Sequence, residues 1–198
     1  MPYETVVPPI TPYRRMMIFV DGENIAQRFE ALVEAGRTPR ADTFHRSKAL
    51  AWHPSYTHLA TIGHHDVIRA TIYASLVGSD DDRRKLHREL RQLTFANNQV
   101  GRLPNNLAAE VFARDKKTQR SKGVDIKLTV DALAHGTAGN FDTALILTGD
   151  GDFVPLVEQL QRAGKQVYIA AFSSGFSERL QAMADAVHVL DGTAFDPV

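Results

Sequence analysis

The chain has 198 residues, of which 43% are hydrophobic, and its 23 basic and 23 acidic side chains give a formal net charge of +0. This length favours one domain with one full core. The absence of cysteine excludes a disulfide framework and thiolate metal sites, and the balanced charge argues against non-specific coating of nucleic acid. No apolar run approaches about 18 residues, so we expect no membrane span and a cytoplasmic location.

The first third of the chain predicts an arm, a strand, a helix and an irregular segment. Prolines in the first residues predict an extended arm over 1–14, and residues 15–198 are expected to form one domain. Apolar spacing then predicts a strand over 15–20 and a helix over 23–35. The segment 37–65 lacks a clean period, is typical of an insertion over a site and contains five of the eight histidines. Their spacing matches no standard ligand pattern, so we predict no metal there.

The middle of the chain predicts three more strands and a basic helix. The strand at 67–77 precedes a helix at 81–96, and short strands are expected at 99–103 and 108–114. One face of this helix carries three arginines, which fit either a solvated face or contacts to phosphates. They are Arg84, Arg88 and Arg91.

A basic loop at 114–122 follows and ends just before Asp125. A cationic loop beside acidic residues suits a polyanionic substrate, although a solvated connector has the same composition. The loop residues expected to contact phosphates are Lys116, Lys117, Arg120 and Lys122.

The last third of the chain alternates helices with strands. Alternation of this kind predicts an α/β fold with a mainly parallel sheet covered on both faces. Helices are expected at 124–134, 154–162 and 176–183, and strands at 145–147, 166–171 and 187–190.

Acidic residues follow two of the predicted strands. Asp150 and Asp152 come directly after an apolar run, each preceded by glycine, and Asp21 ends the first strand in the same way. Parallel neighbouring strands would bring these carboxylates together at the edge of the sheet where ligands bind. Asp125, in the first turn of a helix, would add a fourth like charge. Such a cluster needs a counter-ion, and carboxylate oxygens are the ligands that Mg²⁺ or Mn²⁺ takes.

Four segments of the chain carry a resemblance to a known family. They are Ile-Phe-Val-Asp-Gly-Glu-Asn at 18–24, Lys-Gly-Val-Asp-Ile-Lys-Leu-Thr-Val-Asp-Ala-Leu at 122–133, Leu-Thr-Gly-Asp-Gly-Asp-Phe at 147–153 and Gly-Lys-Gln-Val-Tyr-Ile at 164–169. Together they resemble the NYN domain, in the LabA-like branch of the PIN-like nuclease superfamily, over roughly residues 15–190. The resemblance implies a PIN-like three-layer α/β/α sandwich and an acidic metal site that cleaves RNA.

The resemblance also implies roles for individual residues. The implied metal ligands are Asp21, Asp125, Asp150 and Asp152. Asn24 and Thr148 match polar residues that orient a ligand or water. Asp131 matches a further acid, but it lies six positions after Asp125, about 240° around a helix, so it cannot share that acid's face, and we expect it either to be structural or to support the residues that bind the metal.

These observations favour a ribonuclease that depends on Mg²⁺ or Mn²⁺ and binds RNA, with homo-oligomerisation left open. The main alternative is a non-catalytic RNA-binding or regulatory module on the same fold. A phosphatase of the haloacid-dehalogenase type also uses a strand-end acid pair, but the Lys-Gly-x-Asp segment at 122–125 fits the NYN domain better. No Gly-x-Gly-x-x-Gly follows a strand, which argues against a dinucleotide site.

Overall fold

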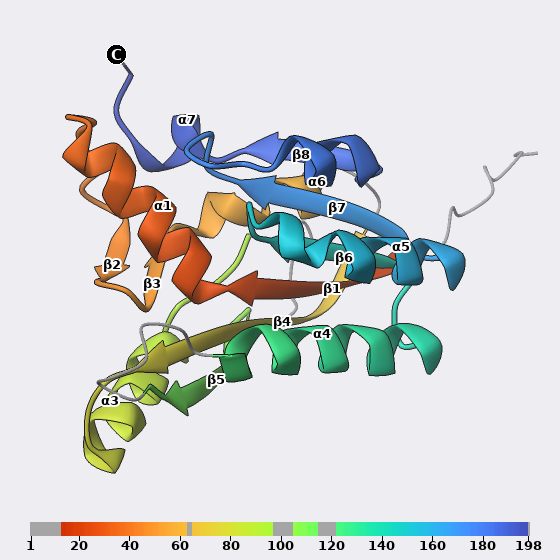
Figure 1. The fold of residues 1–198 in the computed structure, drawn as a ribbon, viewed down its shortest axis with the longest axis horizontal. Helices are drawn as coiled ribbons and strands as arrows, with labels where there is room; N and C mark the ends of the chain where they lie inside the picture. The colour runs from red at the N-terminus through yellow and green to blue at the C-terminus, as the bar shows by residue number, and fades with distance from the viewer. Residues whose placement is uncertain (1–12, 63–64, 97–104, 115–121, 198) are drawn as a thin grey trace, which may run out of the picture.

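The computed structural model describes residues 13–62, 65–96, 105–114 and 122–197. The strands of its central sheet are β1 (Arg14–Asp21), β4 (His65–Leu76), β5 (Ala108–Ala113), β6 (Thr143–Leu147), β7 (Gln166–Ala171) and β8 (Ala186–Val189). They lie in the order β5-β4-β1-β6-β7-β8, and every neighbouring pair is parallel (Figure 1). The predicted α/β fold with a parallel sheet is therefore confirmed.

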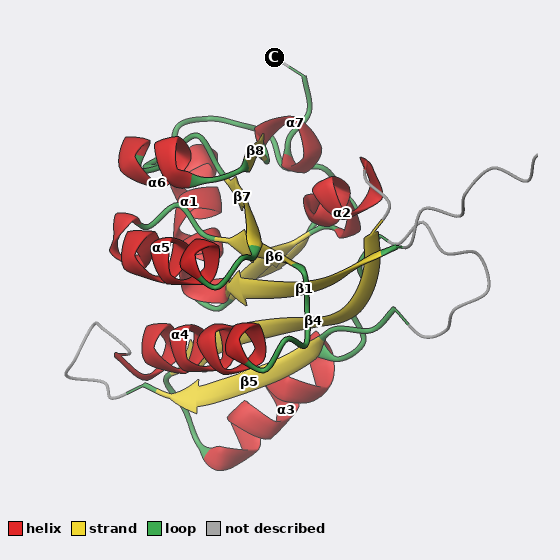
Figure 2. Cartoon of the chain, turned by 90° about the vertical axis from the view of Figure 1, so that its right-hand side faces the viewer, coloured by secondary structure: helices red, strands yellow, loops and turns green. Residues whose placement is uncertain are grey.

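Helices cover both faces of this sheet. They are α1 (Gly22–Glu34), α2 (His58–Ile62), α3 (Asp80–Leu90), α4 (Lys122–Thr137), α5 (Val154–Arg162), α6 (Glu178–Met183) and α7 (Asp191–Ala194). Figure 2 shows α4 and α5 on one side of the sheet and α2 on the other. The result is a three-layer α/β/α sandwich, the architecture expected of a PIN-like domain.

The central strand β1 divides the apolar interior into two cores. Successive side chains of a strand point to opposite faces, and both faces of β1 are covered. Ile18 and Val20 pack into a first core with residues of α1, α2 and α3, whereas Met17 and Phe19 pack into a second core with α4, α5 and α6. An uninterrupted apolar run in the sequence is thus the signature of a strand buried on both sides.

One helix is shorter than its sequence pattern predicts. The helix expected over 81–96 ends at Leu90 as α3. Beyond it, Phe95 is buried in the first core, and the indole of Trp52 donates to the carbonyl of Thr94 at 2.9 Å. Burial of the Phe95 side chain therefore overrides the helical pattern of the sequence. The strand predicted over 99–103 lies outside the described residues.

The segment expected to be insertion-like contains defined structure. It holds a hairpin of β2 (Phe44–Arg46) and β3 (Leu50–Trp52), a 3₁₀ turn (Pro54–Thr57) and α2. The hairpin approaches the start of α1 so closely that a Cβ on Gly22 would lie 2.4 Å from the carbonyl oxygen of Ala49. Only glycine fits there, because real Cβ contacts do not come within that distance.

In the part of the chain that the structure describes, no helix has the length and apolar character needed to cross a membrane.

Candidate functional site

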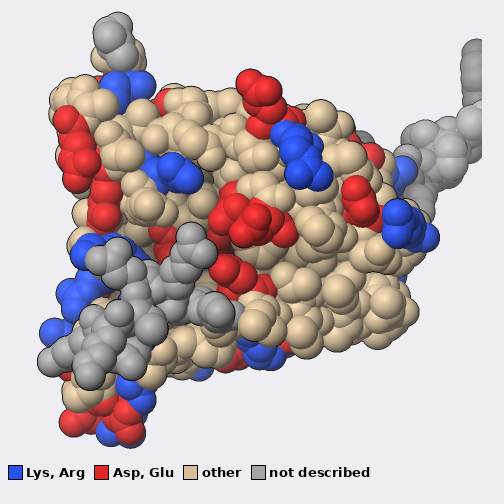
Figure 3. Space-filling model, in the orientation of Figure 1, with Lys and Arg blue, Asp and Glu red and all other residues tan. Residues whose placement is uncertain are grey.

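The carboxyl ends of β1 and β6 define the candidate site. The chain leaves β1 through α1 and reaches β4 on one side, while β6 pairs with the other side of β1. This reversal of strand order is a topological switch point, where open α/β sheets bind ligands. Asp21 is the last residue of β1, and Thr148 follows the last residue of β6. Figure 3 shows acidic side chains gathered near the centre of this face of the molecule.

Asp21 is fixed in a buried position by two segments of the chain. Its side chain caps α1 by accepting a hydrogen bond from the backbone N–H of Asn24 at 3.1 Å, and it accepts a second from the Thr148 hydroxyl at 3.0 Å. The amide oxygen of Asn24 in turn accepts from the backbone N–H of Gly149 at 2.9 Å. The predicted residues Asp21, Asn24 and Thr148 are thus joined in one hydrogen-bonded unit across β1 and β6.

Thr148 also connects this unit to the acid pair that follows β6. Its hydroxyl oxygen accepts from the backbone N–H of Asp150 at 3.2 Å, so its single proton is left for Asp21. The carboxylate of Asp150 accepts from the backbone N–H of Asp152 at 2.9 Å and caps the 3₁₀ turn of Gly151–Phe153. The two glycines of this motif let other segments approach it closely, since a Cβ on Gly151 would lie 2.8 Å from the Ser177 hydroxyl oxygen and one on Gly149 would lie 3.3 Å from the carbonyl oxygen of Gly175.

Burial and charge raise the pKa of Asp21 to about 7. Burial is the largest cause, because removal from water disfavours a charged carboxylate. The hydrogen bond from Asn24 opposes the change, and the negative charges of Asp125 and Glu23 reinforce it. Asp21 is therefore an acid whose ionised form needs a compensating positive charge.

The remaining acids repel one another within the same site. The pKa of Asp125, in the first turn of α4, is raised by partial burial and then by the negative charges of Glu23, Asp150 and Asp152. The structure thus places Asp125 within electrostatic range of Asp21, Asp150 and Asp152. Asp131 is not among the charges that raise the pKa of Asp21 or Asp125. Its carboxylate instead accepts hydrogen bonds from the Tyr73 hydroxyl and the Lys127 ammonium.

Glu23 is a member of this site that sequence reasoning missed. It forms an ion pair with Arg114, directly after β5, and accepts a hydrogen bond from the Ser75 hydroxyl of β4. The Arg114 guanidinium also donates to that hydroxyl at 2.8 Å. In the sequence, Glu23 is indistinguishable from an ordinary first-turn acid of a helix, and only the packing of β4 and β5 beside α1 brings its partners to it.

Arg28 is a second side chain that sequence reasoning missed. Its Nε is buried and has no hydrogen-bond partner within the described part of the chain. A Cβ on Gly175 would lie 2.3 Å from its guanidinium carbon, and the carbonyl of Gly175 packs against Gly149 in the acidic loop. The sequence offers one signal for the position of Arg28. It follows Asn24 by four positions on the same helix, and residues four apart lie on one face of a helix.

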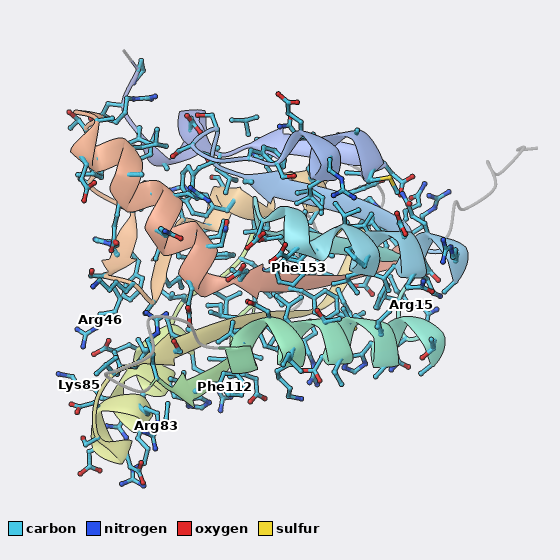
Figure 4. The ribbon with its side chains drawn as sticks, in the orientation of Figure 1. Arg15, Arg46, Arg83, Lys85, Phe112 and Phe153 are labelled. Carbon is cyan, nitrogen blue, oxygen red and sulfur yellow. The ribbon has the colours of Figure 1, made fainter. Side chains whose placement is uncertain are left out.

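The predicted basic loop falls mostly outside the described residues. Lys116, Lys117 and Arg120 lie there, and Lys122 is described only as the first backbone position of α4. The alternative basic face on α3 is partly neutralised, since Arg84 pairs with Asp81 at 2.7 Å. Figure 4 shows Arg83 and Lys85 of α3 together with Arg46 at one end of the molecule, whereas Phe153 lies near its centre.

The donor set fits a hard divalent cation. The acids offer only carboxylate oxygens, which Mg²⁺ and Mn²⁺ prefer, and a cation would compensate the negative charges that, together with burial, raise the pKa of Asp21 and Asp125. Among the described residues, no group of three or more histidine or acidic side chains is close enough to form a complete cage. A cation would then contact one or two of the four acids directly and reach the others through its bound waters, since Mg²⁺ usually keeps several waters.

The fold and this acidic edge define a PIN-like α/β protein. The family model of the NYN domain matches residues 15–191 of the chain. The protein therefore belongs to the NYN domain family, which is part of the PIN-like nuclease superfamily.

Two proteins illustrate how far similarity extends. Uncharacterized protein MJ0482 of Methanocaldococcus jannaschii is 38% identical over 64 residues, an alignment that covers 32% of this chain and 27% of that protein. The crystal structure of a protein of unknown function, VPA0982, from Vibrio parahaemolyticus has a TM-score of 0.60 and 21% identity, and the match covers 93% of this chain and 97% of that one. This second similarity establishes the shared fold.

Proposed function

We propose that this protein is a ribonuclease of the LabA-like branch that hydrolyses RNA phosphodiester bonds with Mg²⁺ or Mn²⁺. The observation that carries the proposal is the buried carboxylate of Asp21, held by Thr148 beside Asp150 at the switch point. Membership of the NYN family supports the reaction class, because the wider superfamily consists of nucleases. The proposed metal ligands are Asp21, Asp125, Asp150 and Asp152.

The chain's own residues would keep the ligands in place before substrate arrives. Thr148 and Asn24 fix the Asp21 carboxylate by hydrogen bonds, and Asn24 also fixes the Gly149 backbone at the start of the acidic loop. Such pre-organisation lowers the cost of ordering the site during the reaction. A bound divalent metal supplies a Lewis acid and a water of lowered pKa for attack on phosphorus.

Positive side chains around the acids would bind the RNA backbone. Arg28 is a described candidate, since its guanidinium packs against Gly175, whose carbonyl lies against Gly149 of the acidic loop, and its Nε has no partner among the described residues. The basic loop residues Lys116, Lys117, Arg120 and Lys122 are further candidates predicted from the sequence. Arginine and lysine contacts to phosphates give affinity without sequence preference.

A non-catalytic RNA-binding module on the same fold is the second candidate function. The observation that favours it is the absence, among the described side chains, of a complete metal cage. A protein that only binds RNA would keep the fold and the basic residues but would not need metal. The two candidates therefore differ in whether Mn²⁺ supports turnover.

A cleavage assay separates them. Wild-type protein is incubated with single-stranded and structured RNA over a Mn²⁺ series, beside Asp150→Asn and the matched control Asp81→Asn, whose carboxylate is exposed on α3. The proposal expects Mn²⁺-dependent cleavage by wild type and Asp81→Asn, and none by Asp150→Asn with its fold retained. Unchanged turnover of Asp150→Asn at saturating Mn²⁺ would sink the metal-site assignment, and RNA binding without any cleavage would establish the second candidate.

A further inference from the structure

A small pocket lies directly beside the acidic site and shares two of its carboxylates. Its volume is about 220 Å³, and its lining comes from α4 and from the turn that follows β6. The lining residues are Asp125, Ile126, Thr129, Val130, Asp152 and Phe153. Figure 3 shows a largely uncharged surface next to the central acidic patch, and Figure 4 places Phe153 near the centre of the same face.

Two apolar side chains of this pocket are unusually exposed. Ile126 is 61% exposed and Val130 is 54% exposed, although the opposite face of α4 is buried in the second core through Val124 and Leu128. Because they lie four positions apart, the two exposed side chains form one continuous strip along the helix. An apolar strip at the rim of a polar site is typical of a binding surface.

We infer that this pocket holds one nucleobase of the RNA strand whose phosphate lies at the acidic site. The inference rests on the proposed function and adds a base-binding subsite to it. A nucleotide combines the two chemistries that the pocket presents, because its base has flat apolar faces while its phosphate is drawn to a cation at Asp125 and Asp152. A purely apolar protein segment would cover these carboxylates without supplying any group that compensates their charge.

The size and polar groups of the pocket fit a single base. Pockets for drug-sized ligands occupy roughly 300–1,000 Å³, so a pocket of about 220 Å³ accepts a smaller group such as one ring system. Phe153, which is only 4% exposed, lines the pocket from the protein interior, and the exposed Ile126 and Val130 line it at the surface. The Thr129 hydroxyl can donate or accept a hydrogen bond at the edge of the base.

The test compares two small phosphate probes, one with a base and one with a hydroxyl group in its place. Binding of adenosine 5′-monophosphate and of ribose 5-phosphate is measured by calorimetry with Mn²⁺ present, for wild type and for Ile126→Ser/Val130→Ser. Both replaced side chains are exposed, so the variant should keep its fold, which its melting temperature checks. Val33→Ser on α1, at a similarly exposed valine, is the matched control.

We expect wild type and Val33→Ser to bind the base-containing probe about tenfold more tightly, which corresponds to about 1.4 kcal/mol, and the double variant to lose this preference. Equal binding of both probes by wild type would overturn the subsite, whatever the cleavage assay shows. A wild-type dimer in sedimentation velocity that the double variant abolishes would also overturn it, by showing that the strip is covered by a second copy of the chain. Base-dependent binding in a protein that cleaves no RNA would retain the subsite and refute the ribonuclease.

Discussion

Arg114 and Glu23 form an ion pair that joins the end of β5 to the first turn of α1. Both side chains are largely buried, and the Ser75 hydroxyl contacts both of them. Glu23 adds to the repulsion felt by Asp21 and Asp125, and the Arg114 guanidinium is the cation that faces this charge at the rim of the acidic site. Arg114 is thus a positioning residue for the acidic edge.

Replacement of Arg114 by glutamine should destabilise the protein by roughly 2 kcal/mol, because it leaves the Glu23 carboxylate largely buried without its cation. Urea denaturation of wild type and variant measures the change. Arg84→Gln is the control, since its pair with Asp81 is solvent-exposed and should contribute less than about 1 kcal/mol. Adding Glu23→Gln to Arg114→Gln should recover part of the stability, and a double variant no more stable than Arg114→Gln would argue against a specific pair.

The stability of the metal-free protein should fall as pH rises, because the folded-state pKa of Asp21 is raised from 3.8 to about 7. Between these values the folded state binds more protons than the unfolded state, so the free energy of unfolding decreases with pH. For Asp21 alone the full effect is on the order of 4 kcal/mol. Thermal denaturation in a chelator should show Asp21→Asn gaining stability relative to wild type from pH 4 to pH 8. A difference between the two proteins that stays constant over this range would contradict the raised pKa.

Addition of Mn²⁺ should raise the melting temperature at neutral pH. A ligand bound only by the folded state stabilises it by about 2.7 kcal/mol at a hundredfold excess over its dissociation constant. For a domain of this size each kcal/mol corresponds to roughly 2–4 °C. Differential scanning calorimetry should show the rise in wild type and its loss in Asp125→Asn/Asp150→Asn, and an equal rise in both proteins would place the ion elsewhere.

Substitution of all four basic loop residues by glutamine should weaken RNA binding while leaving the acidic site complete. The residues are Lys116, Lys117, Arg120 and Lys122. If each binds one phosphate of a single strand, the slope of log K against log salt should become shallower by about 0.7 for every phosphate that the variant no longer neutralises. Fluorescence anisotropy with Ca²⁺ in place of Mn²⁺ measures this slope without cleavage. A slope equal to that of wild type would show that the loop does not bind RNA phosphates. The arginines on α3 and at its C-terminal end would then be the next candidates for phosphate binding, namely Arg84, Arg88 and Arg91.

Much of the fold was predictable because its central strands β1 and β6 are buried on both faces. The apolar runs that end at Asp21 and before Thr148 mark β1 and β6, and their shared ending in carboxylates indicates the edge where the acids meet. What the sequence could not supply depends on contacts between distant segments. The Glu23 pair needs the placement of β5, the early end of α3 needs the burial of Phe95, and the pocket beside Asp125 needs the packing of α4 against the turn after β6.

The place of β1 in the sheet has a consequence for how the chain is made. Of the six strands in this sheet, β1 is the first to leave the ribosome, yet one of its two neighbours, β6, is synthesised more than a hundred residues later. A partial sheet of β5-β4-β1 formed before then would have β1 at an open edge, with unpaired backbone groups that can recruit other chains. We therefore expect the chain to be most prone to aggregate before β6 pairs with β1.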